Sequence, residues 1–170
     1  MVLKPQDLLV VLKLWVRRGE TWTYQSLAQA LDMSQAEVHG AAKRARLAGF
    51  LVAKELSATP NILALREFLI HGARYAFPAQ LGSLGLGIPT AHAAAPLKHE
   101  LAVSLDPGPV WPHGEGTTIG LLLDPIYRSV PAAAQEDSRL YELLALLDAL
   151  RVGRSRERQI AARLIEERLR

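Results

Sequence analysis

The prolines and glycines of this chain are concentrated in its middle third, and this distribution is the strongest constraint on its fold. Residues 72–131 contain 8 of the 10 prolines and 8 of the 12 glycines. Both residue types disfavour the interior of a helix, so long helices are expected only in the flanking segments. The distribution therefore predicts a mainly α-helical chain with an irregular middle that holds short strands at most.

The composition indicates a chain that can bury a core. Of its 170 residues, 49% are hydrophobic and 22% are charged, and there is no cysteine, which excludes disulfide scaffolds, cysteine zinc sites and thiol nucleophiles. The N-terminal residues lead directly into a charged amphipathic stretch, unlike a secretory signal. The longest uncharged run, residues 75–97, is interrupted by prolines and is unsuited to spanning a bilayer. We expect a cytoplasmic protein with no membrane partner.

The first 60 residues have helical periodicity with well-defined ends. An apolar stripe predicts a first helix over residues 6–18, which Gly19 ends. Thr23 is the expected N-cap of a short helix over residues 24–31. Ser34 and Glu37 have the spacing of a capping box. A third helix is predicted to follow as far as about residue 48, just before Gly49.

Two short helices joined by a brief turn form a helix-turn-helix pattern. Residues 23–39, TYQSLAQALDMSQAEVH, resemble the core of bacterial winged-helix regulators of the MarR-like type, and LAGFL at 47–51 is similar to the helix end before the wing. Ala28 and Ala42 match the small residues at which such helices cross. The resemblance covers about residues 6–60 and implies a DNA-binding domain over residues 1–60. Its wing is expected to be short or absent, because residues 51–59 contain no glycine and Thr59 and Pro60 are expected to cap another helix.

The predicted third helix, residues 34–48, carries the candidate DNA-reading residues. Gln35, His39, Lys43 and Arg46 fall within a sector of about 80°, whereas the apolar Val38, Ala41, Ala42 and Ala45 fall elsewhere. Glutamine pairs with adenine, and arginine or lysine pairs with guanine or phosphate. The first 60 residues contain 8 Lys or Arg against 5 Asp or Glu, a balance that favours a polyanionic partner. The full set predicted to contact double-stranded DNA is Gln35, Ala36, His39, Gly40, Lys43 and Arg46, with Thr23, Arg17, Arg18 and Lys54 around them.

Residues 61–170 form the predicted dimerisation, partner or effector region. We expect a helix over about residues 60–71, an irregular segment over 72–131 with short strands at 101–105 and 117–123, and a helical hairpin over 135–170 broken at Val152 and Gly153. The leucine-rich face of the hairpin suits either a homodimer interface or the core of the middle segment, and the sequence does not choose between these.

Catalysis is not indicated by any motif in the chain. His71, His92, His99 and His113 do not have the spacing of a helix-borne metal pair, and the glycine-rich run at 82–87 lacks the order of a dinucleotide fingerprint. We therefore expect no catalytic residues, no metal and no cofactor.

The function that these features favour is a sequence-specific transcriptional regulator, a homodimeric repressor that reads the major groove with residues 34–48. The alternative is an antitoxin or adaptor that binds a protein partner through residues 61–170, with Phe77 and Trp111 as anchors, and regulates itself through its helix-turn-helix. A helix-turn-helix used only for protein contacts would require the third helix to be buried.

Overall fold

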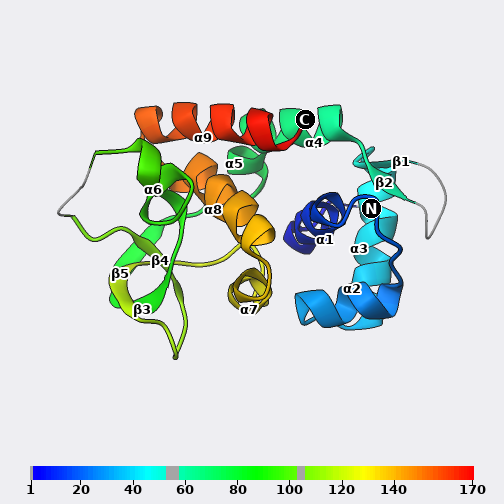
Figure 1. Ribbon diagram of the computed structural model, residues 1–170, viewed down its shortest axis with the longest axis horizontal. Coiled ribbons are helices and arrows are strands. Elements are labelled where there is room, and N and C mark those ends of the chain that lie inside the picture. The colour runs from blue at the N-terminus through cyan, green and yellow to red at the C-terminus, as the bar shows by residue number, and fades with distance from the viewer. Residues whose placement is uncertain (1, 53–57, 103–105) are drawn as a thin grey trace. The chain divides into compact units, whose positions relative to one another are not determined.

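The computed structural model describes residues 2–52, 58–102 and 106–170 and is mainly helical with two small sheets (Figure 1). The chain divides into two compact units. The first unit consists of Met1–Leu65 and Ile126–Leu140, and the second of Arg66–Pro125 and Tyr141–Arg170. The sequence placed a single boundary at residue 60, whereas the first unit also includes a segment from far along the chain. In the described residues, no helix has both the length and the apolar character needed to cross a membrane.

The first unit is built mainly from helices. Its elements are α1 (Pro5–Val16), α2 (Tyr24–Leu31), α3 (Gln35–Leu47), β1 (Leu51–Val52), β2 (Thr59–Pro60) and α7 (Val130–Gln135). Helices α4 (Ile62–Glu67) and α8 (Ser138–Val152) begin in this unit and end in the second.

The predicted helix caps are present in the first unit. The Thr23 hydroxyl accepts a hydrogen bond from the Ser26 amide at 3.0 Å, and the Thr23 amide donates to the Ser26 hydroxyl. Ser34 and Glu37 form the expected reciprocal pair, with distances of 2.8 and 3.2 Å. Gly19 and Gly49 follow α1 and α3 with φ angles of 85° and 82°, a conformation in which glycine avoids the strain of a side chain.

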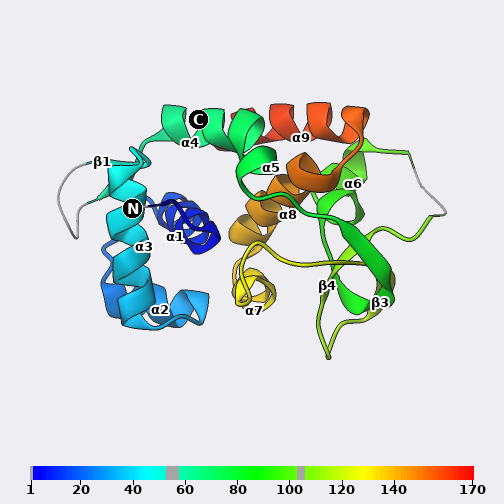
Figure 2. The same ribbon diagram turned by 180° about the vertical axis from the view of Figure 1, so that it is seen from behind.

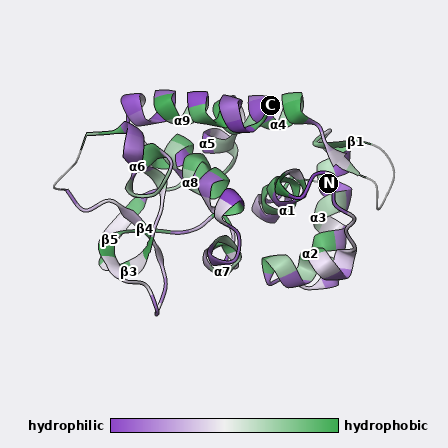
Figure 3. Ribbon diagram, viewed as in Figure 1, coloured by the Kyte–Doolittle hydropathy of each residue, from purple (hydrophilic) through white to green (hydrophobic). Residues whose placement is uncertain are grey.

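Helix α1 lies at the centre of the first unit and is buried along most of its length. It packs on α3, whose Val38, Ala41, Ala42 and Ala45 are all buried, as predicted. The two helices are also joined by an ion pair between Asp7, whose side chain is fully buried, and the Arg44 guanidinium, with N–O distances of 2.7 to 3.1 Å. In Figure 3, α1 is coloured mainly as hydrophobic, in keeping with its buried position.

Two details of the first unit differ from the sequence prediction. Helix α1 ends at Val16, with Arg17 as its C-cap, so Arg17 and Arg18 lie beyond its last turn. Thr59 and Pro60 do not cap a helix but form strand β2, which pairs antiparallel with β1. Each strand has two residues, so this sheet does not contradict the expectation that any wing is short. Asn61 takes the capping role instead, because its side-chain oxygen accepts from the Ala64 amide at 3.3 Å. Lys54 lies outside the described residues.

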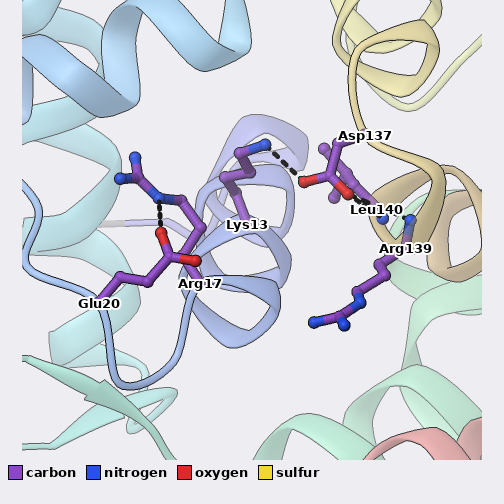
Figure 4. A network of polar contacts seen from close by, with 6 residues as sticks. All are labelled: Lys13, Arg17, Glu20, Asp137, Arg139 and Leu140. Atoms are coloured by element: carbon purple, nitrogen blue, oxygen red, sulfur yellow. Dashed lines mark hydrogen bonds and ion pairs between the residues drawn. The ribbon is translucent and has the colours of Figure 1, made fainter.

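A polar network explains why residues 126–140 belong to the first unit (Figure 4). The Lys13 ammonium on α1 contacts the Asp137 carboxylate at 2.6 Å, and both groups are largely buried. The other oxygen of Asp137 accepts from the amides of Arg139 and Leu140 at 3.1 Å each, which caps the start of α8. One carboxylate therefore ties a helix start to a helix more than 120 residues earlier.

The second unit combines helices with a small closed sheet (Figure 2). Its helical elements are η2 (Phe68–Gly72), α5 (Ala73–Ala76), η3 (Ala91–Ala93), α6 (Leu97–Glu100) and α9 (Ser155–Arg168), and its strands are β3 (Leu81–Pro89), β4 (Pro109–Pro112) and β5 (Thr118–Leu123). A π-helical turn, η2, connects α4 to α5 without a break, so the helix predicted over residues 60–71 spans residues 62–76.

Residues 81–89 were predicted to be part of an irregular segment, but they form the nine-residue strand β3. Strand β3 runs antiparallel to both β4 and β5, and β4 and β5 pair in parallel, which closes the sheet. A Cβ atom on Gly87 would collide with the Trp111 carbonyl, and one on Gly120 would collide with the Gly108 carbonyl. The glycines therefore permit close approach of the strands.

The other two strand predictions had different outcomes. The strand predicted over 117–123 is confirmed by β5. Of the strand predicted over 101–105, the first two residues follow α6 without being in a strand, and residues 103–105 lie outside the described part of the chain.

Two C-terminal helices are present, as predicted, although Val152, which was expected in the break, belongs to α8. Helices α8 and α9 are separated at Gly153 and Arg154, and the predicted inner face of α8 is buried; this face consists of Leu140, Leu143, Leu144, Leu147 and Leu150. The Arg168 guanidinium near the end of α9 contacts the Glu142 carboxylate near the start of α8 at 2.8 Å. The leucine face is thus occupied within the chain, which favours the core over a homodimer interface.

The second unit contains a buried polar cluster around Asp148 on α8. One carboxylate oxygen accepts from the Trp111 indole at 2.6 Å and from the Thr90 hydroxyl at 2.8 Å. The other oxygen contacts the Arg151 guanidinium at 2.7 Å, and Arg151 also donates to the Phe77 carbonyl. Trp111 is fully buried, so its predicted role as an exposed anchor for a partner was wrong.

Candidate nucleic-acid interface

Helix α3 brings six of the predicted DNA-contacting residues onto one surface. The side chains of Gln35, Ala36, His39 and Lys43 are exposed, while Gly40 and Arg46 are half-buried. The set extends over about 16 Å of helix, given a rise of 1.5 Å per residue. The opposite side of α3 is buried against α1 and α2, so packing keeps this polar face exposed to solvent.

The two arginines of α3 differ in their environment. Arg44 is neutralised by the buried Asp7 carboxylate, because its Nε donates to Oδ2 and its Nη2 donates to Oδ1, and this pair fixes the helix in place. Arg46 has two guanidinium nitrogens, Nε and Nη2, that are covered and have no hydrogen-bond partner in the described structure. Because these two donors are covered, they would reach an acceptor on DNA only if the Arg46 side chain changed its rotamer.

The start of α3 carries a carboxylate that is paired on several sides. Besides capping the helix, Glu37 accepts from the Tyr127 hydroxyl at 2.5 Å and contacts the Arg128 guanidinium at 3.3 Å. The Tyr127 hydrogen bond, followed by the hydrogen bonds at Ser34, lowers the pKa of Glu37 from 4.5 to about 2. The sequence did not indicate Tyr127 or Arg128, because they lie about 90 residues away from Glu37.

An aromatic contact also reaches the exposed face of α3. The Tyr24 ring at the start of α2 lies 5.0 Å from the His39 ring, centroid to centroid, at an interplanar angle of 66°. Tyr24 in turn contacts the buried Trp22 ring at 5.6 Å, edge to face. The sequence analysis placed His39 on the DNA-reading face and did not anticipate that a neighbouring helix would hold it.

The remaining predicted residues lie close to the start of α2 or after α1. Thr23 is exposed, with its hydroxyl engaged in the helix cap. Arg17 pairs with the exposed Glu20 at 2.8 Å. The Arg18 guanidinium lies 4.0 Å from the centre of the Trp15 ring and donates to the Trp15 carbonyl. Both arginines are therefore oriented by local contacts.

The histidines that sequence inspection considered for a metal site are not gathered with acidic residues. Across residues 2–52, 58–102 and 106–170, no group of three or more histidine, aspartate or glutamate side chains is arranged to hold a metal ion. His92 contacts Glu157 at 3.6 Å as a simple pair. The glycine-rich run at 82–87 lies in strand β3 and does not form a phosphate-binding loop.

No protein-family model, no curated protein and no solved structure matches this chain. The function of the α3 surface is therefore argued from its own geometry and chemistry.

Proposed function

We propose that this protein is a sequence-specific DNA-binding transcriptional regulator, in which α2 and α3 form a helix-turn-helix and α3 enters the major groove. The observation that supports the proposal best is the division of α3 into a buried alanine- and valine-lined side and an exposed side bearing Gln35, His39 and Lys43. A helix of this kind fits the width of the major groove and offers donors and acceptors to base edges.

Each exposed group has a role suited to its chemistry. The Gln35 amide is suited to adenine, whereas Lys43 and Arg46 are suited to guanine edges or phosphates. Ala36 and Gly40 keep the surface low, so that the helix backbone approaches the groove. Arg17, Arg18 and Thr23 contact phosphates and set the position of the unit on the duplex.

The regulator acts as a homodimeric repressor in this proposal. A two-fold dimer would place its two α3 helices in successive major grooves, about 34 Å apart. Because the leucines of α8 are occupied within the chain, the dimer contact would use another surface, and the helical hairpin of α8 and α9 would serve as a scaffold.

The test is fluorescence anisotropy with a random-sequence DNA duplex over a salt series. The test variant replaces Gln35, His39, Lys43 and Arg46 with alanine. Its matched control removes the same four residue types from exposed positions of the second unit, by replacing Gln159, His99, Lys98 and Arg156 with alanine.

We expect wild-type affinity to fall steeply with salt because phosphate contacts release counterions. The α3 variant should lose binding and the control should keep it. If the single replacements Lys43→Ala and Arg46→Ala remove base contacts, each should weaken binding by about 1–3 kcal/mol. Absence of wild-type binding at low salt, or equal loss in both quadruple variants, would contradict the proposal.

A second candidate function is supported by an apolar surface on the sheet of the second unit. Leu84, Leu86 and Ile119 are 58%, 46% and 68% exposed, and Leu86 is the direct cross-strand partner of Ile119. Exposed apolar side chains grouped in this way are typical of protein-binding surfaces. An antitoxin or adaptor would use this surface for its partner and α3 for autoregulation. A partner that co-purifies with the full chain and is lost on Leu84→Lys would favour this candidate.

A further inference from the structure

The contact between Tyr24 and His39 links the buried core of the first unit to the exposed face of α3. Three rings, those of Trp22, Tyr24 and His39, contact one another in succession, and Trp22, which is 9% exposed, is the buried end. The Tyr24 ring packs against Trp22 at 5.6 Å and against His39 at 5.0 Å, both in edge-type geometry. Aromatic pairs at these distances and angles attract each other beyond the burial of their surfaces. The His39 imidazole is therefore held in one orientation although it is exposed to solvent.

The other exposed groups of the α3 face differ from His39 in this respect. Gln35 and Lys43 are long, exposed side chains, and binding must restrict their rotamers at a cost in conformational entropy. A side chain that is already restricted in the free protein loses less freedom when it meets a ligand. His39 is thus the pre-organised member of this surface.

We infer that Tyr24 is a positioning residue for DNA recognition, which holds the His39 imidazole in the orientation that donates a hydrogen bond to an acceptor on the duplex. This inference rests on the proposed function and adds a specificity role for a residue of α2. Tyr24 acts through its ring and through His39. It is distinct from the phosphate contacts of Thr23 beside it.

A purely structural role for Tyr24 makes a different prediction. In that case, loss of the ring would lower the stability of the first unit, and its effect on DNA affinity would not depend on the presence of His39. The two roles are separated by asking whether the effects of the two residues on affinity are coupled.

The experiment is a double-mutant cycle measured on the duplex that wild-type protein selects from a random-sequence pool. The variants are Tyr24→Leu, His39→Ala and their combination. Leucine retains apolar packing against Trp22, and far-UV circular dichroism checks that each variant is folded. Tyr24→Phe keeps the ring and removes the hydroxyl. Tyr75→Leu is the matched control, because it removes an exposed tyrosine from the second unit, where the ring contacts Arg74.

We expect Tyr24→Leu to weaken binding about 3- to 10-fold, the range that corresponds to freeing one side chain. Tyr24→Phe and Tyr75→Leu should bind like the wild type. In the His39→Ala background, Tyr24→Leu should have no further effect. Additive losses, or an equal loss in Tyr24→Phe and Tyr24→Leu, would overturn the inference; the second result would point instead to a hydroxyl–phosphate contact.

A measurement without DNA distinguishes failure of this inference from failure of the proposed function. The Tyr24 ring current should displace the proton resonances of His39, which are assigned by their absence in His39→Ala, and this displacement should vanish in Tyr24→Leu. If wild-type protein selects no duplex, the proposed function and the inference both fail. If it selects a duplex and the ring-current shift is absent, only the inference fails.

Discussion

Asp7 in the first unit and Asp148 in the second are both buried aspartates paired with an arginine, but they are held in different ways. Asp7 accepts from the Lys4 amide and from Arg44, which lies on another helix. Asp148 receives donors from Thr90, Trp111 and Arg151, which come from the loop after β3, from β4 and from its own helix. The first carboxylate fixes one helix against another, and the second fixes a helix to a sheet.

This difference identifies what each unit depends on. In the first unit, the buried charge sets the position of the helix that carries the candidate DNA-reading face. In the second unit, it satisfies an indole and a hydroxyl that the closed sheet has removed from water. We therefore expect loss of Asp7 to affect function as well as stability, and loss of Asp148 to affect mainly stability.

The largest effect is expected for Asp148→Ala. This change leaves the Arg151 charge and the donors of Trp111 and Thr90 without their acceptor, which should cost about 3–5 kcal/mol, toward the upper end of that range. Hydrogen exchange of peptides from β4 should report the loss of protection in the second unit. Asp124→Ala, at an exposed position, is the control and should change stability by less than about 0.5 kcal/mol.

A somewhat smaller loss, about 3 kcal/mol, is expected for Asp7→Ala, because it leaves mainly the Arg44 guanidinium uncompensated. Hydrogen exchange of α1 peptides should show it, and DNA affinity should fall in parallel. Asp7→Leu combined with Arg44→Met removes both charges and should restore most of the stability. If the double variant were as unstable as Asp7→Ala, the unpaired arginine would not be the cause.

The carboxylates with shifted pKa values should affect the acid stability of the two units in opposite directions. In the first unit, the pKa of Glu37 is lowered to about 2, and the pKa of Asp137 is also lowered, because hydrogen bonds from Lys13 and two backbone amides outweigh the opposing effect of burial. Both groups stabilise the folded state above their unfolded pKa values, and this contribution is lost as the pH falls through the folded ones. In the second unit, burial raises the pKa of Asp148, so protonation of this group favours the folded state.

Acidification from pH 6 to pH 3 should therefore reduce hydrogen-exchange protection in α3 before it does so in β4, once intrinsic exchange rates are corrected for pH. The variant Glu37→Gln with Asp137→Asn should flatten the acid response of the first unit. Loss of protection at the same pH in both units would contradict this prediction.

The smallest effect on stability is expected for Leu84→Lys on the exposed face of the sheet. Because the side chain is 58% exposed, we expect a change within about 0.5 kcal/mol in denaturant unfolding. The lysine should nevertheless interrupt the exposed apolar surface of the sheet, so self-association of the protein with rising concentration should decrease in sedimentation experiments. A loss above about 2 kcal/mol would show that Leu84 is part of the folded core.

Local signals in the sequence were sufficient for helices α2 and α3 of the first unit and, apart from its last residues, for α1. Thr23, Ser34 and Glu37 satisfy backbone amides within three residues, so the chain near each of them determines the cap. The exposed and buried sides of α3 also follow from helical periodicity alone. These features required no knowledge of distant residues.

Several features that the sequence analysis missed depend on distant partners. The glycines of β3 were interpreted as loop residues. Gly87 is needed in the strand because a side chain there would collide with the Trp111 carbonyl on β4, which the local sequence does not reveal. Trp111 resembled an interface anchor, because its acceptor, Asp148, lies 37 residues later. Tyr127 reaches Glu37 across 90 residues. In the candidate site, helical periodicity predicted which residues of α3 are exposed. Which of their side chains contact a neighbouring helix, as His39 contacts Tyr24, depends on tertiary packing.

The return of Ile126–Leu140 to the first unit has a consequence for the order in which the protein is made. The Lys13 ammonium cannot meet Asp137 until more than 120 further residues have been added to the chain. At about 5–20 residues per second, the 75 residues between Leu65 and Leu140 occupy the ribosome for about 4–15 s. For most of this interval α3 lacks the Tyr127 and Arg128 partners of Glu37. The first unit is therefore completed only late in translation, although most of it is synthesised first.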